Sequence, residues 1–447
     1  MISTILKEEV IYMEMKMKVA LHNLGCKVNA YETDAMGQLF KEAGYEIVPF
    51  NEIADIYIIN TCSVTNIADR KSRQMLHKAK KKNPKAIVAA VGCYAQVASE
   101  ELDKDNAVDV IVGNNKKKDI VSVIQQYISD NSVSETVVDI AKDSEYEDLE
   151  LQTVTEHTRA YIKIQDGCNQ FCSYCIIPYA RGRIRSRRPE SIYTEIRRLA
   201  EQGFMEVVLT GIHLSSYNFE GVKLIDVISE IDKIDGIKRI RLGSLEPGII
   251  TDEFAKKLSG YKKICPHFHL SMQSGCDETL KRMNRHYTAE EYFSKCELLR
   301  KYFNNPAFTT DVIVGFPGET EEEFDTTKKF AEKVRFAELH VFKYSKRNGT
   351  RAAVMEHQVE EQIKAKRSDL LIGVGEKLKN IYREDFIGKK VPILFEEKVI
   401  VEDEEYYVGH TTEYIKIAVK SDADICGKML DATISDKLNS EIMLATL

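Results

Sequence analysis

From Tyr161 to Tyr344 the sequence alternates short apolar segments with amphipathic ones, and this alternation restricts the possible fold more than any other feature of the chain. The apolar segments have the length of buried strands, and the amphipathic ones have the period of helices. Strands that alternate with helices pair in parallel, so six such units predict a parallel (β/α)6 barrel or partial barrel. The predicted strands are Tyr161–Ile164, Glu206–Leu209, Arg239–Leu242, His267–Leu270, Thr309–Val314 and Leu339–Tyr344.

Polar and glycine-containing loops follow these strands, at the end where parallel barrels carry their working loops. Glycine lets a ligand approach the backbone, and Ser, Thr, Gln and Glu supply hydrogen bonds to ammonium, ribose and carboxylate groups. Turn chemistry explains any one such loop, but six on one rim predict a binding site. The candidate binding residues on the rim are Thr210, Gly211, Ser244, Glu246, Gln273, Gly315 and Phe316.

The loop after the first of these strands contains Cys168, Cys172 and Cys175. Iron–sulfur clusters are held by cysteine thiolates, usually four, so three thiolates leave one iron open to an exogenous ligand. A structural zinc site is the alternative, but such sites are closed and tetrahedral. No fourth Cys or His follows within several residues of Cys175. The sequence therefore favours an iron–sulfur cluster with an open iron.

A smaller α/β pattern precedes the barrel, and its cysteines have a regular placement. Cys26, Cys62 and Cys93 each follow the carboxyl end of a predicted strand, which in open α/β sheets is the ligand-binding edge. Isolated buried cysteines are common, but three at equivalent positions predict a second cluster, again with an iron that lacks a protein ligand. The predicted strands are Val19–Leu24, Ile56–Asn60, Ala86–Val91 and Val108–Val112, with helices over Asn29–Ala43, up to Lys82 and from Lys116.

The C-terminal pattern changes to short β segments, which predict a compact antiparallel barrel in the style of small oligonucleotide-binding folds. A capping domain without a ligand is the alternative. Tyr406, Tyr407 and Tyr414 fit base stacking and strand packing equally well. The predicted strands are Lys390–Phe395, Tyr406–His410, Tyr414–Val419 and Met429–Ile434, after a helical stretch over Glu356–Asp385.

The fold class is therefore α/β, with an N-terminal doubly wound domain, a central partial (β/α)6 barrel and a small antiparallel β-barrel at the C-terminus. An acidic stretch with weak periodicity lies between the first two domains. We interpret it as a linker or a pair of poorly packed strands. The predicted parts are an N-terminal extension 1–16, the first domain 17–130, the linker 131–153, the central domain 154–385 and the tail domain 386–447.

The net charge of −7 is distributed unevenly, and local patches rather than net charge set affinity for phosphates. The lysine-rich segment Arg70–Lys85 is most simply a solvated helix face. The segment Arg181–Arg188 either caps the following helix or holds a phosphodiester backbone. Because it directly follows the cluster loop, we favour substrate contact through Arg185, Arg187 and Arg188.

Ten cysteines without a signal peptide or an apolar run of about 18 residues predict reduced thiols in the cytoplasm and no membrane span. The remaining cysteines lack metal-like spacing and are interpreted as ordinary thiols: Cys265, Cys276, Cys296 and Cys426. Histidines on or after the predicted strands, His213, His267 and His269, are interpreted as satisfied core groups rather than ligands.

The three-cysteine loop, with Tyr174 before its last Cys, resembles the signature of the radical S-adenosylmethionine superfamily, in which the open iron chelates S-adenosylmethionine. From Met17 to Leu447 the chain further resembles the methylthiotransferase family of that superfamily. The segments that carry this resemblance are Leu24–Glu32, Asn60–Thr65, Val91–Gln96, Asp166–Pro178 and Thr310–Thr320.

This resemblance implies two [4Fe-4S] clusters, S-adenosylmethionine as cofactor, Tyr174 among the cofactor-binding residues, and a substrate-binding tail barrel of the TRAM type. Members attach a methylthio group to an adenosine beside the tRNA anticodon or to an aspartate of a ribosomal protein. Two segments most resemble the branch that acts on N6-threonylcarbamoyladenosine at tRNA position 37: Lys27-Val28 and His269–Ser274. The isopentenyladenosine branch more often has Gln-Met in place of Lys27-Val28.

The implied partners are tRNA and an electron donor such as flavodoxin or ferredoxin, and we expect a monomer. A non-catalytic iron–sulfur protein that binds RNA is the alternative from another functional class. The rim residues suited to S-adenosylmethionine argue against it.

Overall fold

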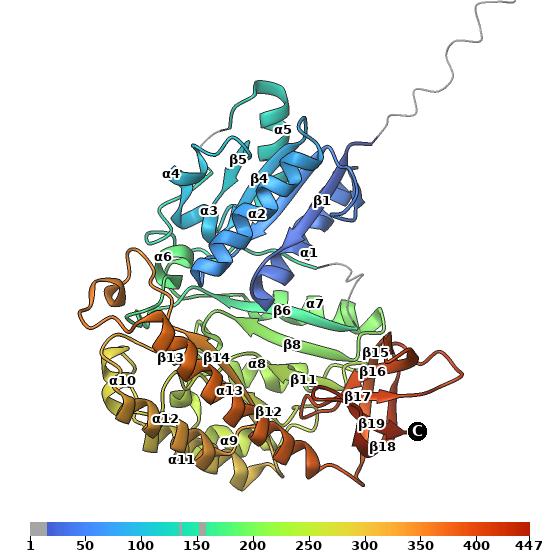
Figure 1. The fold of residues 1–447 in the computed structure, drawn as a ribbon. Helices are drawn as coiled ribbons and strands as arrows, with labels where there is room; N and C mark the ends of the chain where they lie inside the picture. The colour runs from blue at the N-terminus through green and yellow to red at the C-terminus, as the bar shows by residue number, and fades with distance from the viewer. Residues whose placement is uncertain (1–15, 134–135, 152–157) are drawn as a thin grey trace, which may run out of the picture. The chain divides into compact units, whose positions relative to one another are not determined.

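The computed structural model describes residues 16–133, 136–151 and 158–447. It divides the chain into two compact units. The N-terminal unit comprises Met1–Ser63 and Ile67–Val138, and the barrel unit comprises Val64–Asn66 and Asp139–Leu447 (Figure 1). The predicted extension 1–16, apart from Lys16, and the predicted boundary at residue 154 lie outside the described residues.

The N-terminal unit is built on a five-stranded parallel sheet in the order β2-β1-β3-β4-β5. Phe40 and Ile124, from helices α1 and α5, pack on one face of the sheet, and Leu76 from α2 packs on the other. Helices on both faces confirm the predicted doubly wound arrangement. The elements are β1 (Lys18–Asn23), α1 (Lys27–Glu42), β2 (Glu46–Val48), β3 (Ile56–Thr61), α2 (Asn66–Lys82), β4 (Ile87–Gly92), α3 (Cys93–Val97), α4 (Ser99–Leu102), β5 (Val110–Val112) and α5 (Ile120–Asp130).

The barrel unit contains all six predicted parallel strands, in two sheets with the orders β11-β8-β6-β7 and β12-β13-β14. Parallel bridges Ile240–Ile264 and Leu245–Leu270 connect the two sheets. A short antiparallel strand, β7, was not predicted and pairs with β6. The strands are β6 (Arg159–Asp166), β7 (Arg185–Ser186), β8 (Glu206–Gly211), β11 (Arg239–Leu242), β12 (His267–His269), β13 (Ala307–Val314) and β14 (Glu338–Lys343), with a small hairpin of β9 (Asn218–Phe219) and β10 (Val222–Lys223).

Helices cover the outside of this curved sheet, and the largest core of the molecule lies between the two layers (Figure 1). Leu209 and Val312 from strands pack there with Ile196 from a helix. Two helices begin at capping boxes, in which Thr288 and Thr320 satisfy free backbone N–H groups. The helices are α6 (Ile177–Arg181), α7 (Pro189–Glu201), α8 (Leu224–Ile231), α9 (Asp252–Ser259), α10 (Asp277–Arg282), α11 (Ala289–Tyr302), α12 (Glu321–Val334) and α13 (Glu361–Glu384).

The tail forms a closed barrel of mostly antiparallel strands in the order β15-β16-β17-β19-β18, which confirms the predicted architecture. Its core includes Phe395 and Ile417 together with Tyr382, in the last turn of α13, and Phe386, which follows that helix. One strand, the four-residue β19, was not predicted. The strands are β15 (Lys390–Val401), β16 (Glu404–His410), β17 (Lys416–Val419), β18 (Met429–Lys437) and β19 (Met443–Thr446).

The tyrosines considered for base stacking are packing residues. Tyr414 stacks between the rings of His267 and His410, with centroids 5.1 and 4.5 Å away. The guanidinium of Arg241 lies 4.7 Å from the Tyr414 centroid. Tyr406 and Tyr407 are 5% and 7% exposed. Their burial corrects the suggestion that these rings are available to nucleic-acid bases.

The acidic stretch expected to be a linker is irregular, as predicted, but part of it packs tightly on the barrel unit. Leu149 and Leu151 are buried, and the N–H of Leu151 donates to Glu195 of α7 at 2.9 Å. The carboxylate of Asp148 lies 2.9 Å from Arg187. The acidic stretch therefore supplies counter-charge to the buried Arg187.

Within the described residues, no helix combines the length and the apolar character that a membrane crossing requires.

Candidate functional site

The loop of Cys168, Cys172 and Cys175 follows β6, and its first turn requires glycine. Gly167 has φ +71°, and a Cβ there would lie 1.8 Å from the carbonyl oxygen of Arg183. The preceding Asp166 is buried and accepts hydrogen bonds from the Gly167 N–H at 2.8 Å and from Arg181. The sequence Asp-Gly-Cys thus fixes the direction in which the cysteine loop leaves the sheet.

A second segment, Arg282–Arg285, holds the cysteine loop from the other side. The N–H of Ser173 donates to the carbonyl of Met283 at 3.0 Å, and its hydroxyl donates to that of Arg282 at 2.8 Å. The side chain of Asn284 donates to the carbonyls of Gln170 and Phe171 at 3.2 and 3.1 Å. These contacts fix the loop before any ligand binds, which is the preorganisation a functional site needs.

Arg285 connects the cysteine loop with the rim of the barrel. Its Nη1 donates to the sulfur of Cys172 at 3.2 Å, and its Nη2 contacts both carboxylate oxygens of Glu246. Sequence reasoning missed Arg285 because one arginine in a basic segment carries no distinguishing signal. Its position makes it a source of positive charge beside the thiolates of a cluster.

The three thiols suit an iron–sulfur cluster by their chemistry. Burial raises the pKa of Cys168 to about 11 and that of Cys175 to about 12. A thiolate buried in this way needs a compensating cation, and a bound metal deprotonates its thiol ligands. Cysteine thiolates are the usual ligands of iron–sulfur clusters, so the donor set fits one held by Cys168, Cys172 and Cys175.

The predicted rim residues follow neighbouring strands. Gly211 is in register with Gln165 of β6, and Leu209 of β8 is in register with Leu242 of β11. Thr210 and Gly211 at the end of β8, and Ser244 after β11, therefore lie at the same edge as the cysteine loop. Gln273 has φ +64° and forms a bridge with β13 through the hydrogen bonds of its backbone.

The loop Gly315–Glu319 is shaped by its charged end. The Glu319 carboxylate accepts a hydrogen bond from the N–H of Gly315 at 2.6 Å and pairs with Arg367 at 2.7 Å. Gly315 has φ +70°. Phe316 is fully buried and packs edge-on against Tyr174 and Tyr344. The Phe316 side chain supports the site from within, which corrects the prediction that it contacts the cofactor directly.

One rim histidine departs from its predicted role as a satisfied core group. Neither ring nitrogen of His213 has a hydrogen-bond partner among the described residues, and both nitrogens are buried. Burial lowers the pKa of His213. Its backbone N–H donates to Gln165 at 2.7 Å, which places the loop after β8 against β6.

The cysteines of the N-terminal unit follow three adjacent strands, β1, β3 and β4. Thr61 and Gly92 are in register at the ends of β3 and β4, so Cys62 and Cys93 leave the sheet side by side. A Cβ on Gly25 would lie 2.8 Å from the sulfur of Cys62, which brings the loop of Cys26 against it. The three thiols therefore share one edge of the sheet, and their chemistry also suits an iron–sulfur cluster.

A buried polar network reaches the sulfur of Cys93. The side-chain nitrogen of Asn114 lies 3.6 Å from that sulfur, and Lys117 donates to the Asn114 oxygen. Lys117 also pairs with Glu32 at 3.0 Å, and both side chains are fully buried. Sequence reasoning missed this network because Glu32 lies far from Asn114 and Lys117 in the chain, and the sequence does not show that their side chains meet.

The arginines proposed to contact substrate occupy different environments. Arg187 is fully buried and pairs with Glu195 of α7 and with Asp148. Arg185 is 3% exposed and donates to the carbonyl of Arg181 at 2.7 Å. These two side chains are occupied by groups of their own unit, which corrects their assignment as tRNA contacts. Arg188 is exposed, with its guanidinium 6.0 Å from the ring of Phe219, and stays a candidate.

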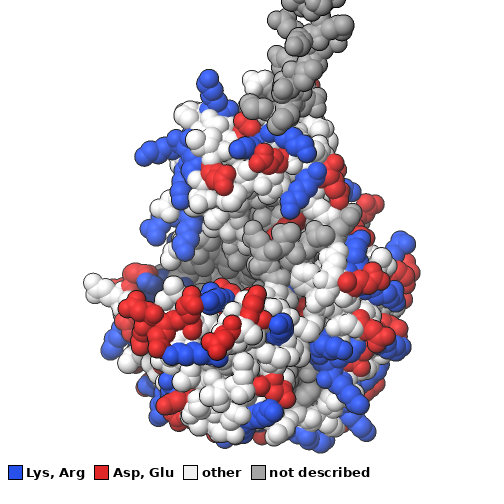
Figure 2. All heavy atoms as spheres, turned by 90° about the vertical axis from the view of Figure 1, so that its right-hand side faces the viewer, with Lys and Arg blue, Asp and Glu red and all other residues white. Residues whose placement is uncertain are grey.

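Surface charge is mixed rather than uniformly negative. On the face shown in Figure 2, lysine and arginine side chains are interspersed with aspartate and glutamate. The exposed face of α2 carries basic residues without an acidic one between them: Arg70, Lys71, Lys78 and Lys81. A net charge of −7 is therefore compatible with a polyanionic partner.

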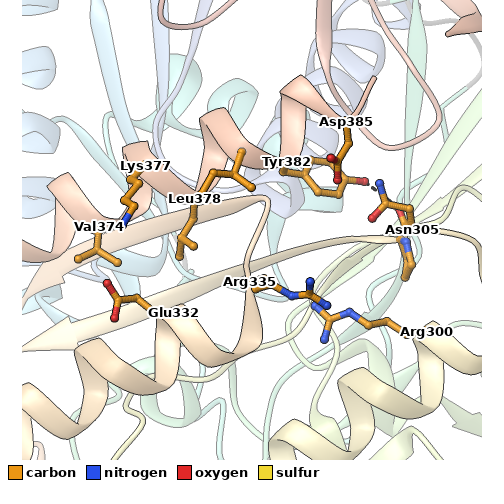
Figure 3. A pocket seen from close by; sticks show the side chains of 11 residues that line it. Arg300, Asn305, Glu332, Arg335, Val374, Lys377, Leu378, Tyr382 and Asp385 are labelled. Atoms are coloured by element: carbon orange, nitrogen blue, oxygen red, sulfur yellow. Dashed lines mark hydrogen bonds between the residues drawn. The ribbon is translucent and has the colours of Figure 1, made fainter. Parts of the chain in front are cut away.

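A cavity of about 390 Å³ lies on the helix side of the barrel unit (Figure 3). Arg300, Arg335 and Glu332 line it together with residues of α13, and the hydroxyl of Tyr382 donates to the carbonyl of Asn305 at 2.9 Å. This cavity contains none of the predicted rim or cluster residues. It is separate from the strand ends that carry the site.

Comparison with known families and proteins matches both units. The Radical SAM superfamily matches residues 162–331, and the family described as Uncharacterized protein family UPF0004 matches residues 18–113. Among solved structures, the radical S-adenosylmethionine methyltransferase TsrM from Kitasatospora setae aligns with a TM-score of 0.58 and 15% identity, over 76% of this chain and 77% of TsrM. That likeness shows the fold.

Curated relatives match over nearly the whole length. The chain is 44% identical to the threonylcarbamoyladenosine tRNA methylthiotransferase MtaB of Bacillus subtilis, over 93% of each chain. It is 40% identical to the MtaB of Aquifex aeolicus, over 87% of this chain and 95% of the relative. It is 33% identical to the tRNA-2-methylthio-N(6)-dimethylallyladenosine synthase of Finegoldia magna, over 92% of this chain and 90% of the relative.

Proposed function

We propose that this chain replaces the C2 hydrogen of N6-threonylcarbamoyladenosine at tRNA position 37 by a methylthio group. The chain belongs to the radical S-adenosylmethionine methylthiotransferase family and is a sulfur-group transferase. As a radical S-adenosylmethionine enzyme, the chain uses an iron–sulfur cluster and S-adenosylmethionine. The site of action would be the cytoplasm, and the chain would act as a monomer.

The observation that carries this proposal is the pair of three-cysteine sets, each at the carboxyl ends of parallel strands in its own unit. We assign Cys168, Cys172 and Cys175 to one [4Fe-4S] cluster and the other set to a second. The C2–H of adenine is neither acidic nor electrophilic, so a radical must remove the hydrogen, and the first cluster with S-adenosylmethionine supplies it. The second set suits the delivery of sulfur.

The residues of this chain bind and orient the reactants. The Arg282–Arg285 segment fixes the cysteine loop, and the rim residues Thr210, Gly211, Ser244, Gln273 and Gly315 line the edge at which S-adenosylmethionine would bind. Glu246 belongs to the same set of rim residues, and its carboxylate is held in place by Arg285. Exclusion of water and exact placement of the adenine would then decide the fate of the radical.

The substrate branch rests on the relatives. Those named for threonylcarbamoyladenosine reach 44% identity, and those named for dimethylallyladenosine reach 36% over shorter coverage and 34% over most of the chain. Lys27-Val28 agrees with the first branch. The dimethylallyladenosine activity is the second candidate because its relatives match the same units.

Binding of tRNA would use exposed basic side chains, among them Arg188 and those on α2. Affinity for a polyanion falls as salt rises, because bound counterions are released on binding. The electron that starts the reaction would come from a small redox protein such as flavodoxin or ferredoxin.

Nucleoside mass spectrometry tests the reaction. The reconstituted protein is incubated anaerobically with reductant and S-adenosylmethionine, with one tRNA pool bearing threonylcarbamoyladenosine and one bearing isopentenyladenosine. A methylthio adduct only in the first pool is the expected result, and Cys172→Ala should abolish it. An adduct only in the second pool would retain the chemistry and replace the substrate. Cleavage of S-adenosylmethionine without either adduct would redirect the search to a ribosomal-protein aspartate.

A further inference from the structure

Two histidines and an aspartate lie close together on one side of the barrel wall. All three are far from the six cysteines in the sequence. They are His269 on β12, Asp311 on β13 and His340 on β14, three strands that are neighbours in one sheet (Figure 1). One ligand atom of each lies within 4.8 Å of the others. None of these side chains has a part in the proposed reaction.

The register of the strands explains why the three side chains converge. His269 is level with Thr309, and Asp311 is level with His340. Side chains two residues apart on a strand point to the same face, so Thr309 and Asp311 share a face. The hydrogen-bonding contact of His269 with Thr309 puts the first histidine on that face as well.

The imidazole of His269 is oriented as metal-bound imidazoles are. Its Nδ1 contacts the hydroxyl of Thr309 at 3.0 Å, and this contact directs Nε2 toward the carboxylate of Asp311. Metal-ligating histidines usually have their second nitrogen held in this way, which fixes the tautomer and the ring. Thr309 therefore orients the imidazole of His269.

The contact between His269 and Asp311 is too long to be a hydrogen bond. Nε2 lies 3.5 Å from the nearer carboxylate oxygen, whereas N–H···O bonds measure about 2.7–3.2 Å. This buried nitrogen has no hydrogen-bond partner in the described part of the chain. A cation between the nitrogen and the carboxylate would satisfy both groups.

We propose that His269, Asp311 and His340 bind a divalent transition-metal ion, of which zinc is the first to test. Two imidazoles and a carboxylate are the ligand types of open zinc and iron(II) sites, which keep a coordination position for water or a substrate oxygen. The ligand atoms need to move inward by about 1 Å to reach bond lengths near 2.0–2.2 Å, which small side-chain rotations supply. The side chains of His269 and Asp311 are 14% and 34% exposed, so an ion can enter from solvent.

The test adds Zn²⁺ to the reconstituted holoenzyme, removes unbound ion by gel filtration, and measures zinc and iron per chain by mass spectrometry. One zinc per chain with unchanged iron is expected. X-ray absorption at the zinc edge should show nitrogen and oxygen at about 2.0 Å and no sulfur at about 2.3 Å. Failure to retain zinc, or sulfur around the zinc, would overturn the proposal, since sulfur would mean displacement of iron at the cysteines.

Variants separate the site from general metal uptake. His340→Ala and Asp311→Asn should each weaken zinc binding by at least about 100-fold while iron content stays at the parent value, which verifies folding. Thr309→Val retains all three ligands and should weaken binding about 10–100-fold. His77→Ala is the matched control, because His77 contacts Asp105 at 2.9 Å without a second imidazole. Equal zinc content in His340→Ala and in His77→Ala would rule the site out.

Discussion

Arg285 holds Glu246 with one guanidinium nitrogen, Nη2, which lies 2.7 and 2.6 Å from the two carboxylate oxygens. The other terminal nitrogen of Arg285 donates to the sulfur of Cys172. The rim carboxylate and the cluster loop are thus tied to one cation. A change in this arginine should alter both the electron affinity of the cluster and the geometry of the rim.

We predict that Arg285→Gln makes the reduction potential of the barrel cluster more negative, by on the order of 50 mV. Reduction adds negative charge to the cluster. The positive charge of Arg285 and its hydrogen bond to sulfur stabilise the reduced form, so their removal makes reduction less favourable. About 1.4 kcal/mol of differential interaction corresponds to about 59 mV for one electron. A redox titration followed by electron paramagnetic resonance in a Cys62→Ala background measures this cluster alone.

The control for Arg285→Gln is Arg300→Gln, which removes an arginine from α11, whose Nη1 pairs with Glu297 at 2.5 Å. That variant should leave the potential within experimental error of the parent. Equal shifts in both variants would mean that net charge, rather than the contact with Cys172, sets the potential.

The two cysteine sets should have separable roles. Cys172→Ala should abolish cleavage of S-adenosylmethionine, because its sulfur belongs to the set we assign to that cofactor. Cys62→Ala should still cleave it but form no methylthio product. Quantification of 5′-deoxyadenosine and of the modified nucleoside in the same reactions measures both steps. Loss of cleavage in both variants would contradict this division.

Much of the fold follows from local pattern. The strands β6, β8 and β13 were predicted within two residues of their ends, because runs such as Val207–Leu209 are buried on both faces and read as continuous apolar segments. The short strands β2, β7 and β19 were not predicted, whereas β11 and β17, which are as short as β19, were predicted. The tail barrel was predicted from its alternation, and its closure comes from β19.

The site was predictable where chemistry marks a residue and not where burial decides its role. The six cysteines were singled out from their spacing and from their positions after predicted strands. Arg187 looked like a phosphate ligand because a sequence shows charge but not the facing Glu195, and Phe316 looked like a cofactor contact because its loop is polar. His269 was read as a lone histidine because its partners come from other strands.

Arg187 and Arg188 should respond differently to neutralisation. Arg187→Gln should destabilise the protein by about 3–5 kcal/mol, because it leaves the buried carboxylate of Glu195 without its positively charged partner. Arg188→Gln should change stability by less than about 0.5 kcal/mol. If Arg188 contacts a tRNA phosphate, its loss should lower the slope of log affinity against log salt by about 1. Thermal unfolding and binding at several salt concentrations make these measurements, and an unchanged slope would remove Arg188 from the interface.

The pairing of β15 and β16 in the tail barrel should weaken in mild acid. His410 contacts Glu396 at 2.7 Å, beside the stacked ring of Tyr414. Burial lowers the pKa of His410 below its usual 6.5. Although burial opposes it, the hydrogen bond of His410 and the charge of Arg159 hold the pKa of Glu396 below its usual value.

Both shifts have the same sign for stability. A depressed folded-state pKa contributes stability above the unfolded-state pKa, and that stability is lost as the pH falls through the folded-state pKa. The loss should therefore begin near pH 6.5 with His410 and continue at lower pH with Glu396. Hydrogen exchange of β15 and β16, corrected for the intrinsic effect of pH, should show faster opening at pH 5.5 than at pH 7.5. His410→Gln should have a flatter response between these values, and an unchanged response in that variant would place the acid-sensitive group elsewhere.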